Sequence, residues 1–184
     1  MKKIKEYLVP TITLFVICLV ATALLGITNA VTAPEIEKLA NQKESDTRKD
    51  VFAQAVSFGE KVDDETNIVP ALDDSGNTIG YVVVTSAKGY GGAVEVMTGI
   101  TADGKVTGIS VLSHSETPGL GAKSKTDDNW RAQFVDKIKG ITVSKDAKSD
   151  NSIDAITGAT TTSKAVVEAV NEAIELAGGV NIGK

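Results

Sequence analysis

The sequence is short of the residues that build metal centres and disulfides. Its 184 residues include one cysteine, Cys18, and one histidine, His114. A single cysteine excludes an intrachain disulfide and a cysteine-ligated cluster built by this chain alone, and a single histidine argues against a histidine-rich metal site. Acidic residues outnumber basic ones by 24 to 19, and basic residues form no cluster beyond the first five positions. A nucleic-acid partner is therefore not expected.

Charge is also missing from a long N-terminal stretch. No charged residue lies between Glu6 and Glu35, and the intervening residues are mostly Leu, Val, Ile, Ala, Thr and Phe. About 20 apolar residues are enough to span a bilayer. A cleaved secretory signal is the alternative, because the basic start of the chain and the small residues at 28–30 fit one, but the apolar run is long for that role. We predict a single membrane helix surrounded by membrane lipid.

The basic residues at the start of the chain predict the orientation of this helix. Lys2, Lys3 and Lys5 precede the apolar run, and positive residues favour the cytoplasmic side of a membrane. The rest of the chain would then lie on the outer face of the cell membrane, periplasmic or extracellular. The length suits one globular domain after the membrane helix. The predicted parts are a cytoplasmic tip and transmembrane helix at 1–33, a stalk and connector at 34–66, and the globular domain at 67–184.

Residues 68–112 carry the pattern of an antiparallel sheet. Two runs rich in β-branched residues, 68–72 and 78–85, are separated by turn-forming residues, and the runs 93–101 and 105–112 are separated by Ala-Asp-Gly. An Asp-Gly pair supplies the positive φ angles that a tight hairpin needs. We therefore predict four strands joined as a meander, in an α+β domain with flanking helices.

Helical spacing of apolar residues occurs in segments before and after the predicted sheet in the sequence. A stalk helix is expected over 34–55, leading out of the membrane, and a final helix with a continuous apolar stripe is expected over 163–177. Between them, 141–143 and 153–156 have the composition of short strands. The loop at 114–125 is too long for a simple hairpin turn, and long ordered loops often carry function.

A further helix is predicted after this loop. Asp127 or Asp128 can cap its start, and the apolar residues Trp130, Phe134 and Ile138 follow at a spacing of four, up to the next glycine. These three side chains would form one face of the helix and pack on the sheet, which assigns Trp130 to the core.

A run of small and hydroxyl residues leads from the last short strand into the final helix. Residues 154–164 read Asp-Ala-Ile-Thr-Gly-Ala-Thr-Thr-Thr-Ser-Lys. Glycine and alanine allow close backbone approach, hydroxyls and Lys164 supply donors, and the first N–H groups of a helix favour an anion. Serine and threonine before a helix are, however, more often simple caps. These residues alone leave a phosphate site and an ordinary helix start both open.

The segment Asp-x-x-Thr-Gly-Ala-Thr at 154–160 resembles the flavinylation signature of the FMN-binding domain family. Two other blocks resemble this family in order and spacing: Gly-Tyr-Gly-Gly at 89–92, followed by Val-Glu-Val, and His-Ser-Glu-Thr-Pro-Gly-Leu-Gly at 114–121. The resemblance extends from about residue 81 to the end of the chain. It implies an FMN-binding domain in which the cofactor FMN is covalently joined to Thr160 by a phosphodiester.

The same resemblance implies which other residues contact the flavin. Leu120 would lie against the flat ring, with the loop at 114–121 as a wall of the site. Tyr90 and His114 also have plainer interpretations, as a core residue and as a loop residue. No catalytic acid, base or nucleophile and no metal ligand are expected. The expected non-covalent contacts are Tyr90, Gly91, Glu116, Thr117, Leu120, Thr157, Gly158, Ala159, Thr161 and Lys164.

Family membership would imply an electron-transfer subunit of an Rnf-type ferredoxin:NAD+ oxidoreductase complex, which couples electron flow to Na+ or H+ translocation. One FMN and no nicotinamide fingerprint cannot perform that reaction alone. Partner subunits of the RnfA, RnfB, RnfC, RnfD and RnfE types are therefore expected, with a flavin transferase for maturation. The alternatives are the C subunit of a sodium-translocating NADH:quinone reductase and, in a different class, a pilin-like structural protein without flavin.

Overall fold

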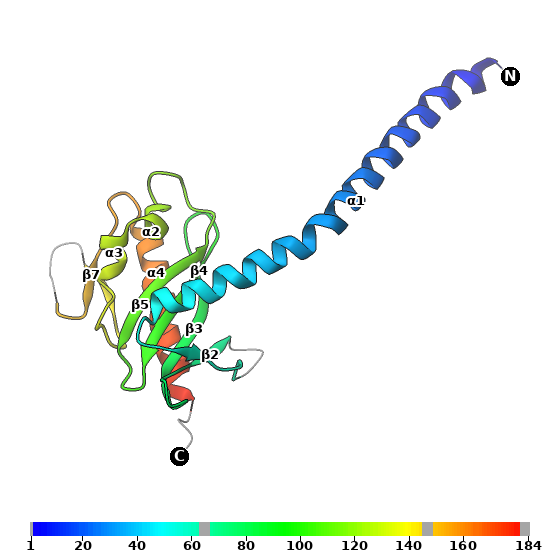
Figure 1. The fold of residues 1–184 in the computed structure, drawn as a ribbon. Coiled ribbons are helices and arrows are strands. Elements are labelled where there is room, and N and C mark those ends of the chain that lie inside the picture. Colours follow the sequence, from blue (N-terminus) through cyan, green and yellow to red (C-terminus); the bar gives the residue numbers. More distant parts are fainter. Residues whose placement is uncertain (1, 63–66, 145–148, 181–184) are drawn as a thin grey trace. The chain divides into compact units, whose positions relative to one another are not determined.

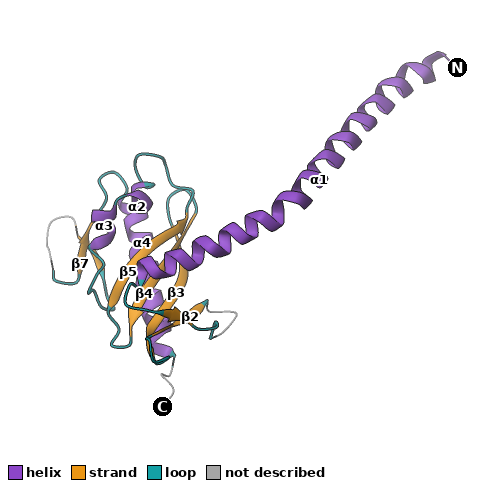
Figure 2. Cartoon of the chain, viewed as in Figure 1, coloured by secondary structure: helices purple, strands orange, loops and turns teal. Residues whose placement is uncertain are grey.

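The computed structural model describes residues 2–62, 67–144 and 149–180 (Figure 1). The chain divides into two compact units, residues 1–45 and 46–184. The first unit is helical throughout its described part, and the second combines a sheet with helices (Figure 2). This α+β organisation confirms the predicted fold class.

Helix α1 spans Lys2–Val51 without interruption. Its segment Pro10–Ile36 is long and apolar enough to cross a membrane. The predicted membrane helix and the predicted stalk helix are continuous in the structure, and the helix runs through Pro34. The residues that follow it are mainly Glu, Lys, Leu, Ala and Gln, which favour helix strongly enough to continue it past the proline.

The second unit is built on a five-stranded antiparallel sheet whose strands follow one another in chain order. All four predicted strands are present and form the predicted meander. The additional strand, β1, has only two residues and pairs at the edge with β2, so it is too short to give a periodic pattern in the sequence. The strands are β1 Ser57–Phe58, β2 Ile68–Leu72, β3 Thr78–Lys88, β4 Ala93–Thr101 and β5 Val106–Ser113.

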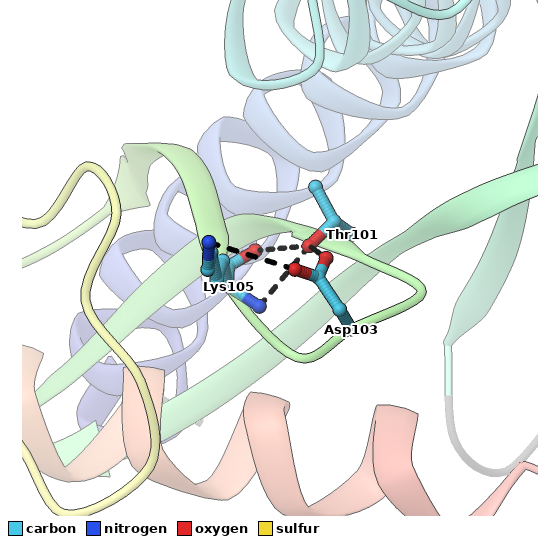
Figure 3. A network of polar contacts seen from close by, with 3 residues as sticks. All are labelled: Thr101, Asp103 and Lys105. Carbon is cyan, nitrogen blue, oxygen red and sulfur yellow. Dashed lines mark hydrogen bonds and ion pairs between the residues drawn. The ribbon is translucent and has the colours of Figure 1, made fainter.

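Side chains close the turn between β4 and β5 (Figure 3). The Thr101 hydroxyl donates a hydrogen bond of 2.5 Å to Asp103 and accepts one of 3.1 Å from the Lys105 backbone N–H. The Lys105 ammonium lies 3.6 Å from the Asp103 carboxylate. Gly104 has a φ of +82°, as the Asp-Gly pair predicted. The hydrogen bond from Thr101 holds the pKa of Asp103 below its ordinary value.

Helix α4, Thr160–Gly179, packs on one face of the sheet against β3 and β4. Alternate strand residues such as Val83 and Val96 are buried there together with Val166 and Val170 of the helix. This follows from the periods of the two elements, because every second residue of a strand and every third or fourth residue of a helix face the same side. The polar core residue Thr85 donates a hydrogen bond of 2.8 Å to a helix carbonyl.

The opposite face of the sheet carries a smaller core. Val51 and Phe52, at the end of α1, are buried with Ala71, Val82 and Met97. The last turn of α1 is therefore part of the second unit by its packing. The Thr107 hydroxyl adds a hydrogen bond of 2.5 Å to the Val51 carbonyl.

Three glycines on neighbouring strands make this packing possible, and we call them the glycine slot: Gly80, Gly99 and Gly108. Gly99 and Gly108 face each other across β4 and β5. A Cβ atom on Gly99 would lie 2.4 Å from the Val51 carbonyl oxygen, and one on Gly80 would lie 2.6 Å from the Phe52 ring. Only the absence of side chains lets the helix end approach the strands this closely.

Two short helices follow the sheet, α2 Lys123–Thr126 and α3 Asp128–Ala132. Asp127 caps α3 as predicted, since its side chain accepts a hydrogen bond of 3.1 Å from the Trp130 N–H. Trp130 and Phe134 are buried and their rings meet edge to face at 5.3 Å between centroids.

The predicted length of this helix was wrong, because α3 ends at Ala132. The backbone beyond it pairs with the start of β5: the Asp136 N–H donates to the Val106 carbonyl at 2.8 Å, and the Val106 N–H donates to the Lys137 carbonyl at 2.9 Å. Asp136 adopts a φ of +62°, which a right-handed helix does not permit. Ile138 is accordingly 52% exposed instead of packing on the sheet.

Two short strands, β6 Thr142–Ser144 and β7 Ser152–Asp154, form a separate parallel pair. Asn171 of α4 holds the chain just before β6. Its side-chain oxygen accepts hydrogen bonds of 2.9 Å from the N–H groups of Gly140 and Ile141, and its amide donates to the Ile141 carbonyl at 2.9 Å. Because β6 pairs with β7, these hydrogen bonds also help to fix β7, the last strand before α4.

Candidate functional site

A cavity of about 570 Å³ lies at the N-terminal end of α4. Cofactor and ligand sites commonly have volumes of roughly 300–1,000 Å³. Residues from the three sequence blocks at 89–92, 114–121 and 154–160, which are far apart along the chain, meet here. The lining residues are Tyr90, Glu116, Thr117, Leu120, Gly121, Gly158, Ala159, Thr160, Thr161 and Thr162.

The first turn of α4 forms one wall of this cavity. The helix begins at Thr160, three residues before the predicted start at Ser163. The Ser163 hydroxyl accepts a hydrogen bond of 2.9 Å from the Ile156 N–H and donates one of 3.1 Å to the Ala159 carbonyl, which fixes the turn into the helix. Ala159, at the N-cap, provides no side-chain hydrogen bond. The first-turn N–H groups and the helix dipole therefore favour an anion at this end.

The four threonines of the signature region occupy different environments. Thr157 is exposed and lies outside the cavity lining, whereas Thr160 is half-buried in it. Thr161 lines the cavity and is exposed. Thr162 is buried with 1% of its surface exposed. The hydroxyls of Thr160 and Thr161 are therefore the two that a ligand in the cavity can reach without displacing a buried side chain.

Glu116 connects all three walls of the cavity. It is buried, with 6% of its surface exposed. One carboxylate oxygen accepts a hydrogen bond of 2.5 Å from the Thr162 hydroxyl, and the other accepts one of 2.9 Å from the Gly91 N–H. A buried charge that accepts several hydrogen bonds is stabilised in its ionised form.

The pKa of Glu116 lies below its ordinary value of 4.5. Burial acts in the opposite direction and raises the pKa, but the hydrogen bonds from the Thr162 hydroxyl and from the N–H groups of Gly91 and Tyr90, together with the electrostatic interaction with His114, outweigh it. The carboxylate is therefore negatively charged at neutral pH.

Glycines leave the space that this carboxylate occupies. A Cβ atom on Gly89 would lie 2.3 Å from one Glu116 oxygen, and a Cβ on Gly121 would lie 2.7 Å from the other and 2.6 Å from the Thr162 hydroxyl. The structure shows that Gly89 and Gly121 make room for Glu116.

Two apolar side chains lie at the rim of the cavity. Tyr90 is 79% exposed, so its interpretation as a core residue was wrong, and Leu120 is 45% exposed. Gly158, with a φ of +77°, faces Leu120, and a Cβ on Gly158 would lie 3.2 Å from the Leu120 side chain. His114 lies beside the cavity, where its Nδ1 accepts a hydrogen bond of 3.2 Å from the Glu116 N–H. This contact agrees with the plainer interpretation of His114 as a loop residue.

Three of the expected contact residues lie outside the cavity lining. Gly91 reaches the site through its hydrogen bond to Glu116. Thr157 is exposed beyond the lining. Lys164 is exposed and borders a separate hollow of about 380 Å³ between β6 and α4.

Two lining residues were absent from the sequence prediction: Gly121 and Thr162. Both lie inside or next to the blocks that carry the resemblance. Thr162 lies two residues after Thr160, which places its side chain on a different side of the helix, and only tertiary contact with Glu116 brings it to the cavity wall.

The segment that precedes α4 is held by the short helical region after β5. The Trp130 indole N–H donates a hydrogen bond of 2.7 Å to the Asp154 carbonyl. The Gln133 side-chain oxygen accepts one of 2.8 Å from the Asp154 N–H. Trp130 is buried, as its core assignment required, and it also fixes the first residue of the signature.

Comparison with known proteins agrees with this geometry. Residues 89–175 match the family model described as FMN-binding domain. The match begins at the first of the three blocks and ends within α4, so it includes every residue that lines the cavity. The fold and the cavity thus define an FMN-binding domain.

Relatives of this chain are similar over nearly its whole length. It is 42% identical over 166 residues to the G subunit of the proton-translocating ferredoxin:NAD(+) oxidoreductase complex of Clostridium ljungdahlii, covering 90% of this chain and 86% of that protein. It is 37% identical over 180 residues to the G subunit of the ion-translocating oxidoreductase complex of Methanosarcina acetivorans, covering 93% and 94%. The chain therefore belongs to the family of G subunits of ion-translocating oxidoreductase complexes.

Solved structures with a similar fold come from a related class of proteins. The NqrC structure from Shewanella oneidensis has a TM-score of 0.52 at 21% identity and covers 71% of this chain and 70% of that one. The C subunit of the Na(+)-translocating NADH-quinone reductase from Parabacteroides distasonis has a TM-score of 0.51 at 25% identity, covering 62% and 61%. Both share the α+β fold described above.

Proposed function

We propose that this chain carries FMN joined by a phosphodiester to Thr160 and relays electrons within a membrane ferredoxin:NAD+ oxidoreductase complex. The observation that carries the proposal is the position of Thr160. It is the first residue of α4, it lines the cavity, and the preceding residue, Ala159, provides no side-chain cap. A phosphoryl group on this hydroxyl would lie at the positive end of a 20-residue helix.

The surroundings distinguish Thr160 from the neighbouring hydroxyls. Thr162 is buried and its proton is directed to Glu116, and Thr157 lies outside the lining. Thr161 lines the same cavity, and the resemblance to the family signature selects Thr160 over it.

The remaining lining residues fit a flavin mononucleotide. Gly158 and Ala159 leave the backbone accessible to a phosphate. Tyr90 and Leu120 present exposed apolar surface at the rim, which suits a flat aromatic ring. When bound, the isoalloxazine supplies the electron chemistry and accepts electrons one at a time. A covalent bond makes retention independent of free FMN, whereas micromolar affinity would provide only about 8 kcal/mol.

Membership of a multi-subunit complex implies redox partners on other chains. The Clostridium relative is named as part of a proton-translocating complex, and a relative from Acetobacterium woodii, 38% identical over 187 residues, as part of a Na(+)-translocating one. The partners proposed here are RnfA, RnfB, RnfC, RnfD and RnfE types, with coupling to Na+ or H+. A flavin transferase would attach the cofactor.

The proposed topology is a single membrane pass with the flavin domain outside. It rests on the apolar segment Pro10–Ile36 and on Lys2, Lys3 and Lys5, which precede it. The alternative assignment as the C subunit of a quinone reductase is supported by fold similarity. The identities of 37–42% to G subunits of ion-translocating complexes, over about nine-tenths of the chain, favour the ferredoxin:NAD+ oxidoreductase assignment.

Intact mass measurement tests the covalent attachment. Purified wild-type chain should be heavier than its sequence by one FMN less one water and should fluoresce in a denaturing gel. Thr160→Ala should abolish both signals, and the matched control Thr161→Ala should retain them. Covalent flavin on the Thr160→Ala protein would contradict the assignment.

Protease accessibility tests the topology. In intact cells whose outer membrane, where present, has been permeabilised, added protease should digest the chain after the apolar segment. Protection of the flavin domain would place it in the cytoplasm and contradict the proposed orientation.

A further inference from the structure

We infer that the Glu116 carboxylate is a fixed negative charge in the cavity wall that holds the reduction potential of the bound flavin low. The inference rests on the proposed function, because it concerns a flavin in this cavity. It assigns Glu116 a role in setting how strongly the domain accepts electrons, beyond a role in binding.

The charge is fixed in place by contacts from two other segments. The Thr162 hydroxyl of α4 and the Gly91 N–H of the 89–92 loop each donate to one carboxylate oxygen, at 2.5 and 2.9 Å. The space around the oxygens is limited by Gly89 and Gly121, where even a Cβ atom would come within 2.7 Å of them. Glu116 therefore cannot turn away from the cavity without breaking both hydrogen bonds.

The charge is also left without an ion-pair partner in the described part of the chain. Ion pairs among the described residues include Lys105 with Asp103, Arg131 with Asp128 and Lys139 with Glu175, and none of these reaches Glu116. The hydrogen bonds to the Glu116 carboxylate come from neutral groups, a hydroxyl and backbone amides. Neutral donors stabilise the ionised form but leave its net charge at −1.

Reduction adds charge to the same space. With FMN in this cavity, an electron received from a one-electron carrier in a neighbouring subunit would oxidise that carrier and bring one negative charge into the cavity. Like charges that are close together and shielded from water repel each other strongly. Glu116 therefore disfavours the reduced form relative to the oxidised form, which lowers the potential.

Midpoint potentials of the full-length flavinylated protein in detergent, measured by spectroelectrochemistry at pH 8, test the inference. Glu116→Gln removes the charge and keeps the side-chain shape, with an oxygen that can still accept from Gly91. Glu116→Asp keeps the charge with a shorter side chain. Glu168→Gln removes an exposed charge of α4 that lies outside the cavity lining. We expect Glu116→Gln to shift the potential to a more positive value, Glu116→Asp, which keeps the charge, to shift it less, and Glu168→Gln to remain at the wild-type value.

Equal potentials for wild type and Glu116→Gln would overturn the inference. An equal positive shift in Glu116→Gln and Glu116→Asp would also overturn it, because packing and not charge would then be responsible. If Glu116→Gln does not fold, Thr162→Val provides the test: it keeps the charge and removes a neutral donor, so a rise in potential would contradict the inference. Wild-type protein without FMN by mass would overturn the proposed function as well, whereas flavinylated proteins with equal potentials would overturn only the role of Glu116.

Discussion

The Thr162 hydroxyl lies 2.5 Å from a carboxylate oxygen of Glu116, 46 residues earlier in the chain. This contact joins the first turn of α4 to the loop that follows β5. The other Glu116 oxygen accepts from Gly91, so the third wall of the cavity is tied to the same side chain. The cavity therefore depends on one buried acidic residue and the groups that donate hydrogen bonds to it.

Removal of the Thr162 hydroxyl should weaken the domain. Thr162→Val is expected to lower the free energy of unfolding by about 1.5–3 kcal/mol, the usual contribution of a hydrogen bond to a charged group. Thr162→Ser keeps the hydroxyl and should retain most of the stability. Urea denaturation followed by tryptophan fluorescence measures the difference, and a larger loss for Thr162→Ser than for Thr162→Val would show that the methyl group and not the hydrogen bond matters.

Stability should depend on pH through Glu116. Its pKa is lower in the folded protein than its ordinary value of 4.5, so the folded state binds the proton less readily than the unfolded state. The resulting stabilisation is fully present above about pH 4.5 and is lost as the pH falls through the lower folded pKa. Denaturation curves between pH 3 and 7 should show a steeper loss for wild type than for Glu116→Gln. Parallel pH profiles would contradict this assignment.

The hydrogen bond between the Trp130 indole and the Asp154 carbonyl should stabilise the entry into α4. Trp130→Phe keeps an aromatic ring beside Phe134 but removes the donor, so we expect a loss of about 0.5–1.5 kcal/mol plus the effect of the smaller ring. Hydrogen exchange should increase at the Asp154 N–H, which bonds to Gln133 in the same region. Unchanged exchange there would show that Trp130 acts only through core packing.

The glycine slot should tolerate no side chain. Gly99→Ala places a Cβ 2.4 Å from both the Val51 carbonyl and the Thr107 hydroxyl, and overpacking of this kind costs typically about 1–3 kcal/mol. Gly178→Ala is the matched control, because no atom lies within 4 Å of its Cβ position and alanine favours helix over glycine. Thermal melting should separate the two variants, and equal melting temperatures would contradict the role of the slot.

The sheet could be predicted from sequence because its determinants are local. Alternating residues and Asp-Gly turns act over a few positions, and the four longer strands were found within a few residues of their observed bounds. The helix after Asp127 was predicted too long for the opposite reason. Its periodicity at Trp130, Phe134 and Ile138 is real in the sequence, but backbone pairing with Val106 at the start of β5 competes for the same residues.

The three sequence blocks that form the site could be predicted, but the contacts between their side chains could not. Family resemblance grouped 89–92, 114–121 and 154–160, and the fold brings residues from all three together. The role of Thr162 depends on a contact with Glu116 that no spacing reveals. Glycine is equally ambiguous in sequence, since Gly89 could make room for a ligand or for a neighbouring side chain.

The close approach of Val51 to Gly99 and Gly108 determines where the N-terminal helix can be replaced in a chimeric protein without damage to the domain. Residues 46–51 form the end of α1, yet Val51 and the next residue, Phe52, supply buried apolar groups for one face of the sheet. A chimera that joins another anchor before residue 46 would inherit a complete domain. A junction after Phe52 would uncover Val82 and Met97 on the sheet and favour aggregation. Natural exchange of membrane anchors among such flavin domains should therefore preserve this last helical turn as part of the transferred module.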